Sequence, residues 1–262
     1  MLDALMAKWK SAHGNDETFI ADGPINSDYW EQKDCLRIAW LLKEAHGDFS
    51  AYENSLTKWL SGETLDVGAQ GSHDISALGS AKTKMWKKVM MASAGVLSAL
   101  EENYQPYSAA LLDESAMVSS RNTVMHHVAV ANIKKTGGKP TSSWDDLAVF
   151  AKQDADLITE EVELLQADVL VCGYTLALLE LAIENAKDTS LSILNPEITR
   201  EQGFSILKSE KDGKTHYALL IDMYHPANKY IGFNMWFYHM QGITLAAKKL
   251  CPEWWQQVSH KH

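Results

Sequence analysis

Three polar side chains, each at or just beyond the end of an apolar run, have types suited to acid–base chemistry and to recognition of a polar ligand. Glu44 follows a run that ends at Leu42, Asn132 ends a second run, and His225 follows a third. A carboxylate can position or deprotonate water, and an imidazole can donate or accept a proton. An amide carries both a donor and an acceptor, so it can read one ligand edge at two points. An acid, an amide and an imidazole would therefore share a crevice if the three runs end together.

The elements that must position these residues are predicted to be buried β-strands. The runs at 37–42, 125–131 and 217–223 are almost continuously apolar, which is typical of strands covered on both faces. A further strand is predicted at 167–173, with a glycine at its exit. Ligands of open α/β sheets bind outside the carboxyl ends of the strands. We therefore expect the polar groups to line that edge.

Helical patterns alternate with these strands, and they predict an α/β fold. Helices are expected at 1–18, 144–166, 175–186 and 231–250, with a mainly helical region from 49 to 111 broken by a loop at 67–80. Asp212-Gly213 between two β-rich runs predicts a hairpin. We expect one domain over 1–262, with residues 1–34 as an N-terminal helical extension. The domain is predicted to have a three-layer αβα architecture with a central, mainly parallel four-stranded sheet.

Composition excludes several classes of protein. The net charge of −10 argues against a non-specific nucleic-acid coat protein, although a local basic groove is compatible with it. The three cysteines form no CxxC pair, so neither a zinc site nor an iron–sulfur cluster is expected, and free thiols suit a reducing compartment. No signal peptide and no apolar run of the roughly 20 residues needed to span a bilayer is found. A cytoplasmic monomer without membrane contact is expected.

At these residues the chain resembles the uracil-DNA glycosylase superfamily. Lys43-Glu44-Ala45-His46-Gly47 resembles the Gly-Glu-Ala-Pro-Gly motif of one branch, with Lys43 and His46 as the departures. Asn132 matches an asparagine that ends an apolar strand in the superfamily, and His225-Pro226-Ala227 resembles its His-Pro-Ser motif. The order of the three motifs and their strand contexts carry the resemblance, which spans roughly residues 35–250.

The resemblance implies a monofunctional DNA glycosylase that needs no cofactor, has DNA as its partner and leaves an abasic site. His225 would donate to the pyrimidine O2 as negative charge builds on the departing base, and Asn132 would read the flipped base. Glu44 would position the attacking water, with Asp48 as the nearest rival. A Schiff base formed by Lys43 is the less favoured alternative.

The resemblance also implies the walls of the base pocket, which Ala45, Gly47 and Phe49 would line. Ala45 stands where the best-known branch has its water-activating aspartate. Gly47 stands where that branch has a tyrosine that excludes substituents on C5 of the base. The absence of this tyrosine would admit a 5-modified pyrimidine as well as uracil. Phe49 would stack on the base or belong to the core.

DNA contacts are expected from basic and polar residues around two loops, with Tyr230 or Ile231 as a wedge that fills the vacated stack. These residues are Lys134, Lys135, Lys139, Asn228, Lys229 and Tyr230. The three central residues also have structural interpretations: a salt bridge for Glu44, a turn cap for Asn132 and a backbone-bonded loop residue for His225.

Three whole-protein hypotheses stay open. The first is a glycosylase in base-excision repair or in defence against phage with modified DNA. The second is a non-catalytic module of the same fold that binds nucleic acid or a nucleotide. The third is a hydrolase of free nucleosides, which would suit the acidic net charge.

Overall fold

The long apolar runs form the centre of a β-sheet in the computed structural model, which describes residues 1–45, 55–61, 84–100, 123–137, 143–194, 203–211 and 213–261. The central strands are β2 (Ile38–Glu44), β3 (Val128–Lys134), β4 (Val169–Gly173) and β7 (Lys214–Met223). They lie in the order β3-β2-β4-β7 and are mutually parallel. The strands predicted from these runs are confirmed.

The sheet is larger than predicted and is mixed. It has seven strands in the order β1-β3-β2-β4-β7-β6-β5, so the prediction of four strands was wrong. The two-residue β1 (Gly23–Pro24) pairs antiparallel with β3. On the other side, β6 (Phe204–Lys211) and β5 (Ser192–Leu194) extend the sheet antiparallel to β7. The predicted hairpin is confirmed, because Lys211 pairs with Lys214 across the turn.

The helices occupy most of the remaining described chain. They are α1 (Leu2–Ala12), α2 (Ser27–Trp30), α3 (Leu56–Ser61), α4 (Lys84–Leu100), α6 (Trp144–Gln153), α7 (Ala155–Leu165), α8 (Leu176–Asn185), α10 (Phe233–Leu250) and α11 (Pro252–Val258). The single helix expected at 144–166 is thus two helices that meet at Asp154. The Asp154 carboxylate accepts hydrogen bonds from Trp9 Nε1 and His13 Nε2, so this break anchors the N-terminal helix.

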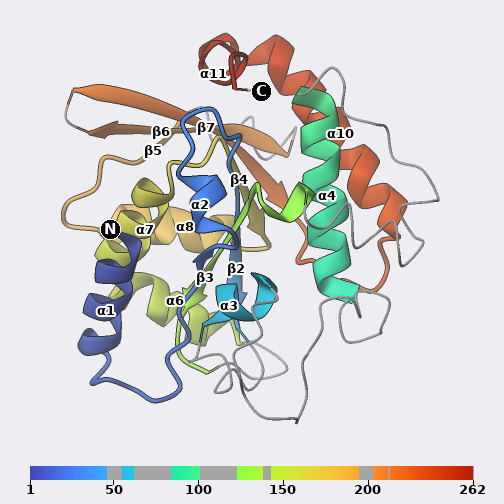
Figure 1. Cartoon of the computed structure of the whole chain (residues 1–262). Coiled ribbons are helices and arrows are strands. Elements are labelled where there is room, and N and C mark those ends of the chain that lie inside the picture. The colour runs from blue at the N-terminus through green and yellow to red at the C-terminus, as the bar shows by residue number, and fades with distance from the viewer. Residues whose placement is uncertain are drawn as a thin grey trace.

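Helices pack on both faces of the sheet, as the α/β prediction requires (Figure 1). Side chains of a strand point alternately to its two faces. Ile38, Trp40 and Leu42 of β2 therefore join the cluster formed with α4, α10 and α11. Ala39 and Leu41 join the opposite cluster, formed with α1, α6, α7 and α8. Both faces of the central strands are buried, which leaves their carboxyl ends as the edge where polar groups can gather.

Candidate functional site

All three sequence motifs end at the same edge of the sheet. Glu44 is the last residue of β2, Asn132 lies two residues before the end of β3, and His225 follows β7 by two residues. The three strands are mutually parallel. The chain passes from β2 to β3 on one side and later to β4 on the other, so the gap between β2 and β4 is the topological switch point. Ligands bind at such points in open α/β sheets. Three strand spacings, about 14 Å, separate β3 from β7, so Asn132 and His225 would flank a ligand rather than touch.

His225 carries its proton on the nitrogen that can face a ligand. Its Nδ1 lies 3.2 Å from the backbone nitrogen of Ala227, and a backbone N–H can only donate, so Nδ1 is an acceptor. The neutral ring must then hold its hydrogen on Nε2. Burial, together with the nearby Lys43 ammonium, lowers the pKa of His225 to about 4. At neutral pH this imidazole is an uncharged hydrogen-bond donor.

Lys43 and Tyr174 occupy the switch point itself. Lys43 Nζ lies 4.7 Å from the centroid of the Tyr174 ring, and burial lowers the pKa of this lysine while the neighbouring Glu44 opposes that shift. Tyr174 directly follows β4 with a φ of 61°, and its ring is 54% exposed. A bulky residue in the left-handed region is strained, and such strain concentrates at functional sites.

Gly173, the last residue of β4, allows this close junction. A Cβ built on it would lie 2.7 Å from Leu42 Cδ2 and 3.3 Å from Pro226 Cδ. The end of β2 and the loop that carries His225 therefore approach each other across this glycine. The glycine exit predicted for this strand is confirmed, and its physical role is to bring the two loops together.

Three aromatic residues beside the motifs, Trp144, Tyr174 and Tyr224, were not predicted as site residues from the sequence. The Trp144 ring, 43% exposed at the start of α6, packs edge-on against Tyr174 with 6.0 Å between centroids. Tyr224 follows β7 and is 58% exposed beside the site. Tyr174 could have been found, because it follows a predicted strand at the same edge as the motifs. Trp144 could not, because its contact depends on how α6 packs.

Glu44 forms the ion pair that the sequence left open as an alternative. Its side chain is 4% exposed, and its carboxylate lies 3.6 Å from Lys134 Nζ. The same amine contacts the Asp146 carboxylate at 2.8 Å and lies 4.7 Å from the centre of the Phe150 ring. Lys134 thus orients Glu44 from within the protein, and its side chain is too enclosed, at 11% exposure, to offer a broad contact to a DNA backbone.

Asn132 lies at the predicted edge but is held by an internal partner. It is 2% exposed, and both its backbone N–H and its Nδ2 donate to Asp22 Oδ2 at 2.8 Å. Asp22 thereby fixes the rotamer of the amide. No sequence pattern points to this partner, which is separated from Asn132 by 110 positions.

Lys135 is not a DNA contact, so that prediction was wrong. Its side chain is 0% exposed, and its amine pairs with Asp22 and with Glu161. It also lies 4.7 Å from the ring centroid of Trp9. Burial, the largest single influence, acts to lower the pKa of this ammonium, but the two carboxylates together outweigh it and raise the pKa.

The loop after β7 presents the remaining predicted DNA contacts at the surface. Lys88 of α4 donates to the carbonyl of Asn228, and Asn228 Oδ1 accepts from the backbone N–H of Tyr230 at 2.8 Å. Lys229 is exposed and Tyr230 is 97% exposed, so both side chains are accessible to a ligand at the surface. Their contact with DNA, and the wedge role of Tyr230, stay predictions.

Several predicted site residues lie outside the described part of the chain. They are Gly47, Asp48, Phe49 and Lys139, together with His46 of the first motif. Ala45 is described and is buried.

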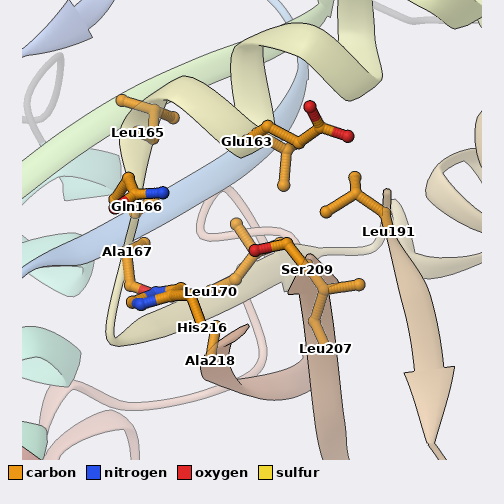
Figure 2. A pocket seen from close by; sticks show the side chains of 12 residues that line it. Glu163, Leu165, Gln166, Ala167, Leu170, Leu191, Leu207, Ser209, His216 and Ala218 are labelled. Carbon is orange, nitrogen blue, oxygen red and sulfur yellow. The ribbon is translucent and has the colours of Figure 1, made fainter. Parts of the chain in front are cut away.

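A separate small hollow lies near the opposite ends of the strands (Figure 2). It is walled by the end of α7 and by β6 and β7, with Glu163, Ser209 and His216 among its polar groups. The His216 Nε2–H donates to the carbonyl of Ala167 at 2.8 Å, and burial lowers the pKa of this histidine. None of the sequence-predicted site residues lines it.

Comparison of the chain with protein-family models, curated proteins and solved structures gave no match. Within the described ranges, no group of three or more His, Cys, Asp or Glu side chains is arranged to hold a metal ion. No described helix has both the length and the apolar character needed to cross a membrane.

Proposed function

We propose that this chain is a DNA glycosylase that hydrolyses the N-glycosidic bond of a flipped uracil or 5-modified pyrimidine. Such a reaction leaves an abasic site and a free base. Its transition state places positive charge on the sugar and negative charge on the departing base. A donor aimed at the base oxygen, and a carboxylate near the sugar, are the groups that the chemistry requires.

The observation that carries the proposal is the state of His225. Its Nδ1 is occupied by the Ala227 N–H, and among described residues no acceptor lies within hydrogen-bonding distance of Nε2. The pKa of about 4 keeps the ring neutral at physiological pH. A preorganised neutral donor can stabilise the developing charge without giving up its proton.

Glu44 and Asn132 would complete the site from β2 and β3, on the other side of β4. Lys134 holds the Glu44 carboxylate in place, where it would position the water that attacks C1′. Asp22 fixes the Asn132 amide, so this side chain would meet the base edge in one orientation. Tyr174 supplies an exposed ring on which a base can stack.

A second candidate function is a module of the same fold that binds a nucleotide without hydrolysing it. The observation in its favour is that Glu44 and Asn132 both engage internal partners, Lys134 and Asp22. Ion pairs and hydrogen bonds of this kind can fix the side chains of a binding site as readily as those of a catalytic site.

The test is release of free base from single- and double-stranded DNA that carries uracil or 5-modified cytosines. Free base, detected by mass spectrometry together with alkali-labile abasic sites, supports the glycosylase. Binding without release supports the module, and release from free nucleosides alone supports a nucleoside hydrolase.

His225→Ala should lower the rate of base release by about 10²–10³-fold, the usual effect of removing one preorganised donor. The matched control is His239→Ala, on the exposed side of α10. Turnover by the His225 variant at the parental rate would contradict the assignment of the donor.

A further inference from the structure

The Lys43 amine differs from the other lysines at this edge in its partners. Lys134 and Lys135 each lie within 4 Å of two carboxylates. For Lys43, the described part of the chain offers no carboxylate within that distance, and its amine lies against the Tyr174 ring instead. The adjacent Glu44 carboxylate, which could have paired with it, is directed to Lys134.

The Lys43 amine lies in surroundings that make loss of its proton easier than for an exposed lysine. Burial is the largest influence on this lysine and lowers its pKa. The effect of Lys43 on the pKa of His225 shows that the two groups are close enough to interact electrostatically. A half-buried amine beside a neutral donor, at the switch point of the sheet, has the position of a nucleophile for a carbonyl carbon.

We propose that Lys43 forms a Schiff base with the aldehyde of an abasic deoxyribose, so that the site cleaves the DNA backbone after base release. This inference rests on the proposed function, because base release is what supplies the aldehyde. The occupant is the ring-opened sugar, which carries its aldehyde at C1′.

The reaction needs no oxidant, reductant or metal. The Nζ lone pair attacks C1′, and the carbinolamine loses its oxygen as water to leave a protonated C=N bond. That bond acidifies C2′–H, whose proton passes to water. The electron pair then expels the 3′ phosphate by breaking the C3′–O bond. Hydrolysis of the C=N bond returns the free amine and releases an unsaturated aldehyde on one strand, while the other strand begins with a 5′ phosphate.

The test uses the full chain with DNA in which the abasic site has been made beforehand. Sodium cyanoborohydride reduces a Schiff base to a stable amine, so the wild-type protein should give a covalent protein–DNA complex. Lys43→Arg should give none, because a guanidinium keeps the charge but is not a nucleophile. The matched control Lys249→Arg, at the exposed end of α10, should be trapped like the wild type. DNA with a tetrahydrofuran analogue, which has no aldehyde, should not be trapped.

Mass mapping of the trapped wild-type peptide should place the adduct on Lys43, which keeps the test independent of how the variant folds. Absence of trapping with wild-type protein, an adduct on another residue, or equal trapping of Lys43→Arg would overturn the inference. Base release without trapping would remove the lyase and leave the glycosylase intact. Trapping without base release from any substrate would support the lyase and count against the glycosylase.

Discussion

His225 shows how much a single residue reveals before its neighbours are known. Its position beyond an apolar run predicted that it would follow a strand, and it does follow β7. Its role as a donor to a ligand stays a prediction. Its tautomer and its lowered pKa could not be predicted, because they depend on the Ala227 N–H and on Lys43, which comes from another strand.

Tyr174 is the residue at which the site stores backbone strain. Its φ of 61° favours glycine, so Tyr174→Gly should be more stable than Tyr174→Ala by about 1 kcal/mol. The free energies of unfolding of the two variants, from urea titrations, give this difference directly. Tyr224, exposed at the end of the neighbouring strand and without a positive φ, is the matched control. There the order should reverse, since glycine costs more conformational entropy than alanine. The same order at both positions would show that Tyr174 is unstrained.

At the scale of elements, the central strands were predictable and the edge strands were not. Long apolar runs predict the central strands. By contrast, β1 has two residues and β5 has three, which is too short for such a run. Whether such a short segment forms a strand depends on the adjacent strand with which it pairs, which is β3 for β1 and β6 for β5. The burial of Lys135 was hidden for a similar reason, because Trp9, Asp22 and Glu161 meet it only in the folded chain.

The buried cluster around Lys135 makes a strong prediction about stability. Lys135→Met should lower the free energy of unfolding by about 3–5 kcal/mol, because it leaves the Asp22 and Glu161 carboxylates buried without their cation. Lys8→Met is the control, since Lys8 forms an exposed pair with Glu160 that should contribute at most about 1 kcal/mol. Denaturant unfolding of both variants measures the contrast. Similar small losses would mean that the cluster does not hold β1 and α7 to the sheet.

Two helical glycines test the close packing of α4 against α10. A Cβ on Gly95 would lie 2.3 Å from the backbone oxygen of Phe237, so Gly95→Ala must push the helices apart. We expect a loss of about 1–3 kcal/mol in the free energy of unfolding. Gly242 on α10 is exposed and has open space around its Cα, so Gly242→Ala should gain up to about 1 kcal/mol from helix propensity. Thermal unfolding separates the two cases, and a stabilised Gly95→Ala variant would contradict this packing.

For the whole molecule, buried histidines predict how stability depends on pH. Burial lowers the pKa values of His127, His216 and His225, the last to about 4, whereas histidine in the unfolded chain titrates near 6.5. Between these values the unfolded state binds more protons, so the free energy of unfolding falls as pH falls from about 6.5 towards 4. Asp222, whose pKa is raised by burial, has the opposite sign, because its stabilising contribution is lost as pH rises.

Comparison of variants isolates the contribution of His225 from the others. His225→Gln cannot take up the proton, so its free energy of unfolding should decline less steeply than that of the wild type between pH 6.5 and pH 4. Urea titrations at a series of pH values give the two slopes. Identical slopes would show that His225 is not held neutral by the fold.

The class of fold could be read from alternating strands and helices, but the choice of substrate could not. Part of the first motif, including Gly47, lies outside the described residues. The acidic net charge of −10 argues only against a broad electrostatic grip on DNA. Under the proposed function, specificity would arise at the edge formed by β3, β2, β4 and β7.

The most direct test of the central claim is mass-spectrometric detection of free base from modified and uracil-containing DNA at neutral pH. Wild-type protein should release a pyrimidine base and leave, for each base released, one abasic site or one strand break derived from it, and His225→Ala should be slower by about 10²–10³-fold. DNA that stays intact across the whole panel, or a His225→Ala variant as fast as the wild type, would contradict the account.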